Sequence, residues 1–372
     1  MQDVAALILV GGKGKRLESL TETKSKPYIS FYGKYRIIDF VLSSLSHSFI
    51  SNVGLLCQYE PFDLMRYIGS GADWDLADFN SGISFLTPYV RTNDELVFQK
   101  GTANAVLSQI EYVRKLDAKY ILILSGDQIY KINFEDVVQK HIESGAELTI
   151  LTNKLDEDLS RYGIIEYDDN HKITGFEEKP VNPKTNNVSM GIYLFNKDFL
   201  LDVLPKADTL VDFGNDLIPY ILSSNHKVYA YPFEGQFFDV GTTKSLYEAN
   251  FHFLDNPEAV SPSGDKMRIY SKPRDYSANI IKEGGSARRS AISDGCVIHG
   301  EVYHSILSYH VLVKKGAKIH ESIVMPDSII EEDVELKNAI VDENVTVKKG
   351  SKLIFDTPTV VSQTMKEVTA NE

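Results

Sequence analysis

The sequence predicts an α/β protein in which a doubly wound, mostly parallel sheet is followed by a parallel β-helix. Three features lead to this prediction. Short, almost continuous apolar runs alternate with amphipathic stretches through residues 1–255, as in strands that are buried on both faces. Residues 256–285 are rich in Pro, Gly and Ser and indicate a linker. From residue 286 onward an apolar residue recurs about every six positions, which is typical of hexapeptide coils.

The predicted strands of the first region are Val4–Val10, Val53–Cys57, Tyr120–Leu124, Leu148–Thr152, Gly191–Phe195 and Val228–Tyr231. Between them, Thr102–Lys115 is the clearest helix, because its apolar residues follow the i, i+3, i+4 spacing of one helical face. Gly101 and Thr102 are expected to interrupt the regular structure before this helix and to cap its N-terminus. Strands separated by such helices predict parallel pairing.

The β-helix prediction depends on a repeat of 17 residues. Three apolar series share this offset: Leu307, Val324 and Val341; Val313, Ile330 and Val347; Ile319, Leu336 and Leu353. Cys296 and Val302 extend the second and third series by one repeat. We expect the coils to occupy residues 286–357, followed by a polar tail at 358–372. The alternative is an antiparallel β domain in which the spacing arises by chance.

Composition narrows the classes of function. The chain has 372 residues and a net charge of −13, which argues against nucleic-acid binding as its main role. The apolar run Ala5–Val10 is far shorter than a bilayer span or a signal-peptide core, so no membrane partner is expected. Cys57 and Cys296 make neither a disulfide framework nor a zinc site, and a reducing cytoplasm is the expected compartment.

A glycine-rich loop, Gly11-Gly12-Lys13-Gly14-Lys15-Arg16-Leu17, follows the first predicted strand. Glycines at such a strand end let backbone N–H groups approach an anion, and cationic side chains suit a polyphosphate. The loop lacks the Gly-Lys-Ser/Thr of a P-loop and the third glycine of a dinucleotide fingerprint. The alternative is a tight turn with exposed lysines. A second basic element, Lys24-Ser25-Lys26-Pro27, follows closely and favours phosphate binding.

Two acids are candidate metal ligands. Asp127 follows the strand Tyr120–Leu124, and the carboxyl ends of parallel strands are where such sheets bind ligands. Asp239 follows two aromatic residues and precedes a glycine turn, which predicts a partly buried acid that requires a partner or a metal. Carboxylates suit a hard divalent ion. The alternative for Asp127 is an ordinary turn residue.

As an ordered set, the motifs resemble a known family. They are Gly11-Gly12-x-Gly14-x-Arg16-Leu17, Lys26-Pro27, Tyr35–Phe40, Ser125–Lys131, Phe176–Pro180, Ser189–Tyr193 and Asp239–Thr242. The chain is similar to the sugar-phosphate nucleotidyltransferases, and among them to the bacterial glucose-1-phosphate adenylyltransferases. The resemblance implies a left-handed parallel β-helix as the C-terminal domain. It also implies formation of ADP-glucose and diphosphate from ATP and α-D-glucose 1-phosphate for glycogen biosynthesis, by an allosteric homotetramer or by a heterotetramer with a homologous subunit.

The resemblance further implies roles for individual residues. Those implied to carry catalysis are Arg16, Lys26, Asp127 and Asp239, with Mg²⁺ held by the two acids. Those implied to bind the nucleotide are Gly11, Gly12, Gly14, Gln58, Gly101 and Thr102. Those implied to bind the sugar phosphate are Gln99, Gly163, Glu178, Lys179 and Ser189, with Lys179 on the phosphate. From the residues alone, Lys179 could equally belong to a surface charge cluster, and Gln58 and Thr102 could be simple loop polar groups.

The sequence also departs from the family pattern. Lys15 stands where Thr is usual, Gln128 where His is usual and Gln99 at an aromatic position, and Phe237-Phe238 replaces a Trp followed by a basic residue. Three alternatives are therefore considered. One is a weakly active or non-catalytic regulatory subunit, and another is an enzyme for UTP or dTTP with the same chemistry. An acyltransferase is the third, and it is disfavoured because no histidine in the coils accompanies a cofactor motif.

Overall fold

The computed structural model describes residues 1, 3–11, 14–78, 81–88, 101–156, 158–206, 211–260 and 267–363. The chain forms two compact units. Unit 1 comprises Met1–Gly12, Val41–Pro61 and Ile68–Phe237, and unit 2 comprises Lys13–Phe40, Phe62–Tyr67 and Phe238–Glu372. The segment Lys13–Phe40 thus groups with the C-terminal residues. Among the described residues, no helix has the length and apolar character needed to cross a bilayer.

Unit 1 is built on a nine-stranded mixed sheet. Its strands are β1 (Val4–Val10), β4 (Asn52–Cys57), β5 (Gly82–Leu86), β6 (Tyr120–Ser125), β8 (Leu148–Lys154), β9 (Gly163–Tyr167), β10 (Ile173–Glu178), β11 (Asn187–Asn196) and β12 (Val228–Pro232). Strands β6, β1, β4 and β5 are neighbours and run parallel, as do β8 and β12. Strand β11 runs antiparallel to β6, β8 and β9. All six predicted strands are present, and the central parallel pairing is confirmed.

The central strands are buried on both faces. Ala5 and Leu7 of β1 join Ile121 and Ile123 of β6 in a core with residues of four helices. These helices are α3 (Thr102–Ser108), α4 (Ile110–Lys115), α6 (Lys197–Lys206) and α7 (Ile218–Ser223). The alternate residues of β1 and β6, which point to the opposite face, are also fully buried. The remaining elements of unit 1 are η3 (Ala72–Trp74), β7 (Gln128–Tyr130), α5 (Phe134–Ser144) and the π-helical turn η4 (Phe213–Leu217).

The predicted helix Thr102–Lys115 is divided into α3 and α4 by Gln109. Its backbone leaves the helical region there, at φ −107° and ψ 20°. The cap also differs from the prediction. Gly101 occupies the cap position with an extended backbone and no side chain to contribute, while the N–H of Thr102 donates to Asp212 Oδ1 at 3.0 Å. A carboxylate distant in sequence therefore satisfies a donor that the local sequence leaves unpaired.

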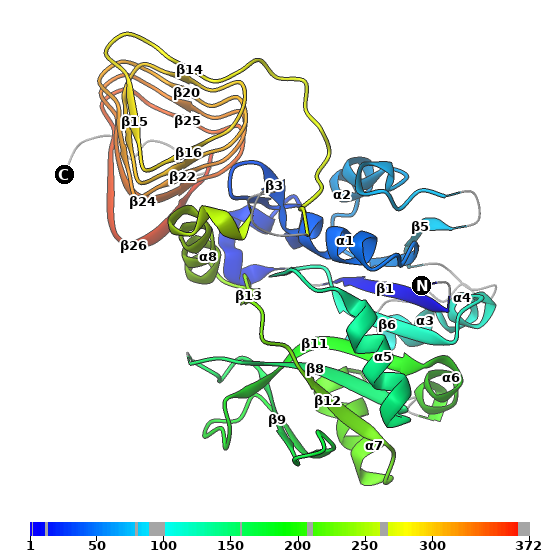
Figure 1. Cartoon of the computed structure of the whole chain (residues 1–372). Helices are drawn as coiled ribbons and strands as arrows, with labels where there is room; N and C mark the ends of the chain where they lie inside the picture. Colours follow the sequence, from blue (N-terminus) through cyan, green and yellow to red (C-terminus); the bar gives the residue numbers. More distant parts are fainter. Residues whose placement is uncertain are drawn as a thin grey trace. The chain divides into compact units, whose positions relative to one another are not determined.

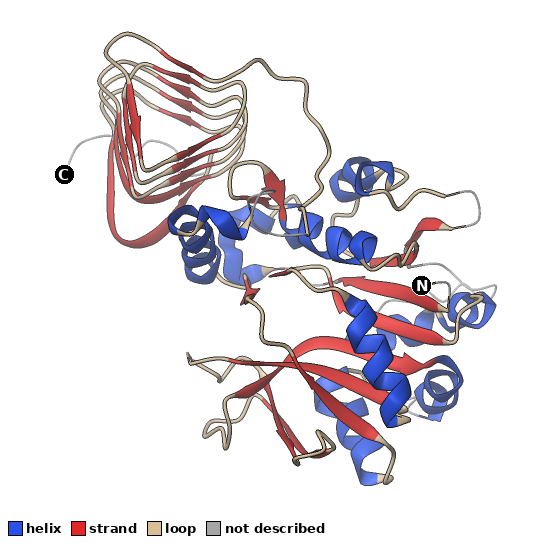
Figure 2. Ribbon diagram, viewed as in Figure 1, coloured by secondary structure: helices blue, strands red, loops and turns tan. Residues whose placement is uncertain are grey.

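Unit 2 contains a parallel β-helix, whose coils are stacked in Figure 1. Its strands are β14 (Ile280–Ile281), β15 (Ser286–Arg288), β16 (Ala291–Ile292), β17 (Val297–Ile298), β18 (Glu301–Tyr303), β19 (Ile306–Leu307), β20 (Leu312–Val313), β21 (Lys318–His320), β22 (Ile323–Val324), β23 (Ile329–Ile330), β24 (Glu335–Val341), β25 (Thr346–Val347) and β26 (Lys352–Val361). Figure 2 shows how short strands alternate with loops around each coil.

The pairing confirms the repeat of 17 residues. Leu307 pairs with Val324 and Val324 with Val341, and the other two series pair in the same way. Cys296 is an exception, because Val313 pairs with Ile298. The preceding coil is two residues shorter at this place, and Cys296 is buried in the core outside the predicted register. The last strand, β26, continues to Val361, beyond the residue where the repeat pattern ends.

The rest of unit 2 comes from two distant parts of the chain. It contains η1 (Lys15–Thr21), η2 (Lys26–Tyr28), β2 (Ser30–Phe31), β3 (Tyr35–Arg36), α8 (Thr243–Asp255) and η5 (Pro257–Ala259). Three elements contain the boundaries between the units: α1 (Ile37–His47), α2 (Phe62–Ile68) and β13 (Phe237–Asp239). A capping box between Thr242 and Ser245 starts α8, which packs against β26.

Candidate active site

Three predicted site residues of unit 1 lie at one edge of its sheet. In the parallel register, Leu9 of β1 pairs with Ser125 of β6, and Val10 pairs with Cys57 of β4. Gly11 and Gln58 follow directly after β1 and β4, and Asp127 lies two residues after the end of β6, so the three share the carboxyl edge. Ligands of open α/β sheets bind at this edge. The sequence prediction of where Asp127 lies is therefore consistent with the strand register.

Asp127 is half-buried and is held by its own turn. The hydroxyl of Ser125 donates to Asp127 Oδ1, and the N–H of Gly126 donates to the carbonyl of Leu9 at 3.0 Å. Burial, together with the negative charge of Asp127, raises the pKa of the buried Tyr130 hydroxyl. Tyr130 therefore stays protonated.

The residues predicted to contact the sugar come together in unit 1. Gly163 pairs with Glu178 across the β9–β10 hairpin, and a methyl group on Gly163 would lie 2.9 Å from Glu178 Oε2. Ser189 on β11 is buried one residue after Val188, which pairs with Ile164. Lys179 Nζ lies 2.7 Å from Glu178 Oε1, and its side chain is 56% exposed. The lysine is therefore accessible to a charged ligand.

The structure adds partners that the sequence analysis missed. Asp212 accepts hydrogen bonds from the N–H and the hydroxyl of Thr102, and a Cβ on Gly214 would lie 2.3 Å from Glu178 Oε2. The segment Asp212–Gly214 thus links Thr102, which is predicted to bind the nucleotide, to Glu178, which is predicted to bind the sugar. Its Asp-Phe-Gly sequence before a helical turn was the available signal. Gly101 packs so closely on Val211 that a Cβ would lie 2.6 Å from that carbonyl oxygen.

In unit 2, two predicted cations converge on the second acid. Lys26 is buried, and its Nζ lies 3.6 Å from Asp239 Oδ1. A Cβ on Gly241 would lie 3.1 Å from the same Asp239 oxygen and 3.3 Å from a guanidinium nitrogen of Arg16. The turn after Asp239 therefore brings that acid and Arg16 to the same place. Two cations therefore lie near one carboxylate, and cationic side chains of this kind can bind phosphate oxygens.

Gly14 belongs to the start of η1. It has a left-handed backbone at φ 56°, and the Thr21 hydroxyl donates to its carbonyl at 2.9 Å. A Cβ at Gly14 would lie 2.8 Å from Thr21 Cγ2, so both conformation and space favour glycine. Gly12 and Gln99, two further predicted site residues, lie outside the described residues.

Each of the two acids, taken within its own unit, is of the type that binds a magnesium ion. Among the described residues, no group of three or more His, Cys, Asp or Glu side chains could form a complete metal cage. Mg²⁺ is usually held by one or two carboxylates together with substrate phosphates and water. The side chain of Asp239 is 19% exposed, and Asp127 is half-buried, so neither acid is completely buried.

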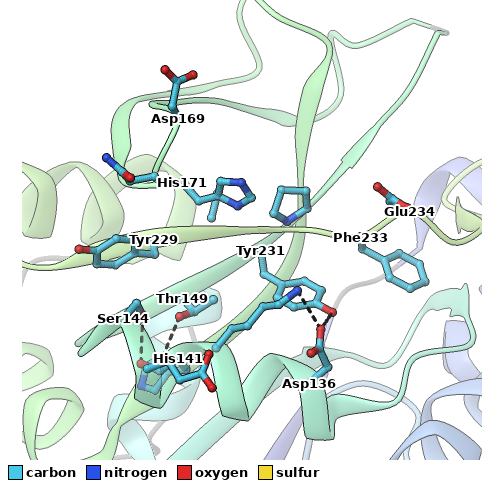
Figure 3. Close-up of a pocket in the computed structure, with 15 residues that line it drawn as sticks. Asp136, His141, Ser144, Thr149, Asp169, His171, Tyr229, Tyr231, Phe233 and Glu234 are labelled. Atoms are coloured by element: carbon cyan, nitrogen blue, oxygen red, sulfur yellow. Dashed lines mark hydrogen bonds and ion pairs between the residues drawn. The ribbon is translucent and has the colours of Figure 1, made fainter.

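A separate cavity of about 780 Å³ lies between α5, β8 and β12 in unit 1 (Figure 3). None of the predicted site residues lines it. Asp136 accepts a hydrogen bond from Tyr231 and lies 3.0 Å from Lys140 Nζ, and buried His141 contacts the Thr149 hydroxyl at 2.7 Å. These polar groups have partners inside the protein, and the cavity differs from the predicted site in place.

Comparison with known proteins identifies the family. The family described as Nucleotidyl transferase matches residues 5–256, and the family described as GlmU-like, C-terminal hexapeptide matches residues 274–362. Glucose-1-phosphate adenylyltransferases of Bacillus cytotoxicus and Bacillus mycoides are each 40% identical over 338 residues, which is 90% of this chain and 90% of theirs. The same enzyme of a Bacillus cereus strain is similar to the same extent. The chain belongs to the glucose-1-phosphate adenylyltransferase family of nucleotidyl transferases.

Proposed function

We propose that this chain transfers the adenylyl group of ATP to α-D-glucose 1-phosphate, forming ADP-glucose and diphosphate for glycogen synthesis. The observation that carries the proposal is the convergence of Arg16 and Lys26 on Asp239. Phosphoryl transfer needs positioned cations around the phosphates more than it needs a covalent catalyst. Family membership over 90% of the chain supports the same reaction.

In the proposed reaction, a phosphate oxygen of glucose 1-phosphate attacks the α-phosphorus of ATP in line, and the bond to the pyrophosphate oxygen breaks. Lys179 holds the attacking phosphate through its exposed ammonium group. Arg16 and Lys26, with the backbone of Gly11 and Gly12, hold the departing pyrophosphate and its growing charge. Asp127 and Asp239 would hold Mg²⁺, which supplies charge neutralisation at the phosphates when it is bound.

The remaining predicted residues would position the two substrates. We assign the base and ribose to Gln58, Gly101 and Thr102, with Gly14 shaping the phosphate loop. We assign the sugar to Gly163, Glu178 and Ser189, with Gln99 near the sugar phosphate. Support comes from the strand pairing that places Gly163 beside Glu178.

The assembly and compartment are also proposals. We propose a homotetramer, or a heterotetramer with a homologous subunit, in the cytoplasm. Exposed Ile280 and Ile281 on β14 are apolar groups of the kind that a subunit contact covers. Cys57 and Cys296 are both buried free thiols, which suits a reducing compartment. Light scattering of the purified chain gives the number of copies.

The direct test is pyrophosphate release by this chain alone, with glucose 1-phosphate and each of ATP, UTP and dTTP, with and without Mg²⁺. We expect release with ATP that requires the metal. Preference for UTP or dTTP would change the nucleotide assignment. No turnover by this chain alone, together with stimulation of a catalytic homologue, would favour the regulatory subunit.

The first variant to test is Asp127→Asn. It should lower turnover about 10²–10³-fold, the size of loss seen when one group that stabilises transition-state charge is removed. The KM for glucose 1-phosphate should change by less than about threefold. Asp136→Asn is the matched control in the same unit, because Asp136 lies at the separate cavity and is exposed. Loss of sugar affinity with intact turnover would contradict the role of Asp127.

A further inference from the structure

The last coils of the β-helix carry two adjacent acids, Asp342 and Glu343, that contact the segment Lys13–Phe40 within unit 2. Lys24 Nζ lies 2.8 Å from Asp342 Oδ1 and 3.5 Å from Glu343 Oε2. The side chain of Lys24 is only 9% exposed. A charge so buried is retained only when it is paired, so these two acids determine where Lys24 can lie.

Glu343 has further partners in the same segment. The Ser30 hydroxyl donates to Glu343 Oε1 at 2.9 Å, and a guanidinium nitrogen of Arg36 donates to the same oxygen at 2.9 Å. Burial opposes ionisation of Glu343, but the charges of Arg36 and Lys24 and the hydrogen bonds from Ser30 and Arg36 together outweigh it and hold the pKa of Glu343 below the ordinary value of 4.5. One carboxylate therefore connects Lys24, Ser30 and Arg36.

Arg36 extends this network to η2. Its guanidinium donates to the carbonyl of Tyr28 and stacks on the Tyr28 ring, 3.6 Å from the ring centroid. Tyr28 is the last residue of η2, which begins at Lys26. Lys26 thus lies between two anchored residues, Lys24 on one side and Tyr28 on the other. Its own ammonium group lies 3.6 Å from Asp239.

We propose that Glu343 is a positioning residue that holds Lys26 in place for the pyrophosphate end of ATP. This inference rests on the proposed role of Lys26. Without the negative charge of Glu343, the buried cations Lys24 and Arg36 lose a shared partner and repel each other. The segment that they anchor then shifts, and a displacement of about 1 Å can cost a reaction about 100-fold.

The inference makes a substrate-selective prediction. Lys26 is assigned to pyrophosphate, whereas the residues assigned to glucose 1-phosphate belong to unit 1. Glu343→Gln keeps the size of the side chain and removes its charge. It should raise the KM for ATP, and for pyrophosphate in the reverse reaction, about tenfold, while the KM for glucose 1-phosphate stays within about twofold. Glu343→Asp keeps the charge and should restore most of the affinity.

The matched control is Glu335→Gln. Glu335 lies on β24 of the same β-helix, 3.5 Å from Lys352, and it is partly exposed. This control should leave both KM values unchanged. If Glu343→Gln changes all kinetic constants equally, or changes none, the positioning role is overturned.

A second route covers the case in which Glu343→Gln does not fold. Lys24→Met removes the pair with Glu343 from the other side, together with the pair to Asp342. It should weaken the binding of inorganic pyrophosphate, measured by calorimetric titration, about tenfold. Where both variants fold, the double variant should bind pyrophosphate no more weakly than either single one, because the residues act as a unit. Pyrophosphate binding is measured without turnover, so it tests Glu343 even if the chain makes no ADP-glucose. Unchanged binding in folded variants would overturn the inference.

Discussion

The two units use charged residues differently. In unit 1, ion pairs such as Arg114–Glu111 lie on the surface, with side chains 55% and 64% exposed, and the core consists of apolar strand and helix residues. In unit 2, Lys24, Lys26 and Arg36 are almost completely buried and paired with acids. Surface pairs contribute little to stability, whereas a buried charge depends on its partner. The comparison predicts that equivalent charge changes have very different effects in the two units.

The largest effect is expected for Arg36→Met. The substitution leaves Glu343 buried with one cation fewer, and breaking a buried pair typically costs about 3–5 kcal/mol. We expect this loss in the free energy of unfolding, measured by urea denaturation with far-UV circular dichroism. The matched control is Arg114→Met, which removes the exposed pair with Glu111 and should cost less than about 1 kcal/mol. Equal losses in the two variants would refute the contrast between the units.

An intermediate effect is expected for Gly163→Ala in unit 1. The added Cβ would lie 2.6 Å from Phe176 Cζ and 2.9 Å from Glu178 Oε2, so Glu178 must move. We expect the KM for glucose 1-phosphate to rise about tenfold, equivalent to about 1.4 kcal/mol, with the KM for ATP little changed. Gly175→Ala in the same hairpin is the control, because the atoms nearest to its Cβ belong to the Glu166 side chain and not to Glu178. A rise confined to ATP would contradict the sugar assignment of Glu178.

The smallest effect concerns His141 in unit 1. Burial lowers the pKa of this histidine below its ordinary value of 6.5, although its contact with Asn196 acts in the opposite direction. The unfolded chain therefore takes up a proton near pH 6.5, while the folded chain stays neutral at that site. The stability that neutral His141 contributes is present above pH 6.5 and is lost as pH falls, by at most about 1.4 kcal/mol per pH unit.

His141→Gln should reduce the fall in melting temperature between pH 7.5 and pH 5.5. The glutamine keeps a polar side chain beside Thr149 but does not titrate. His310→Gln is the control, since His310 is exposed in unit 2 and contacts Asp327 at 2.9 Å. If both variants keep the full pH dependence, buried His141 is not its source.

Local patterns were sufficient for much of the fold. The repeat of 17 residues predicted the register of the coils, because each apolar residue must lie above its counterpart in the preceding coil. Apolar runs predicted the buried strands, because a strand that is buried on both faces has apolar residues at almost every position. The same reasoning failed at Cys296, where one coil is shorter. It also failed at Gln109, whose backbone leaves the helix within an otherwise regular pattern.

The candidate site likewise contains residues that local patterns predicted and contacts that they did not predict. Glycine-rich turns, strand ends and family motifs pointed to Asp127, Lys179 and Asp239 without coordinates. They could not show that Asp212 binds Thr102, or that Glu343 joins three positions of a segment about 300 residues earlier. Repeats and strand ends can be recognised from residues that are close in the sequence, because the backbone geometry of helices and strands repeats over only a few residues. Ion pairs between distant residues depend on which surfaces meet after folding, so only the tertiary structure decided them.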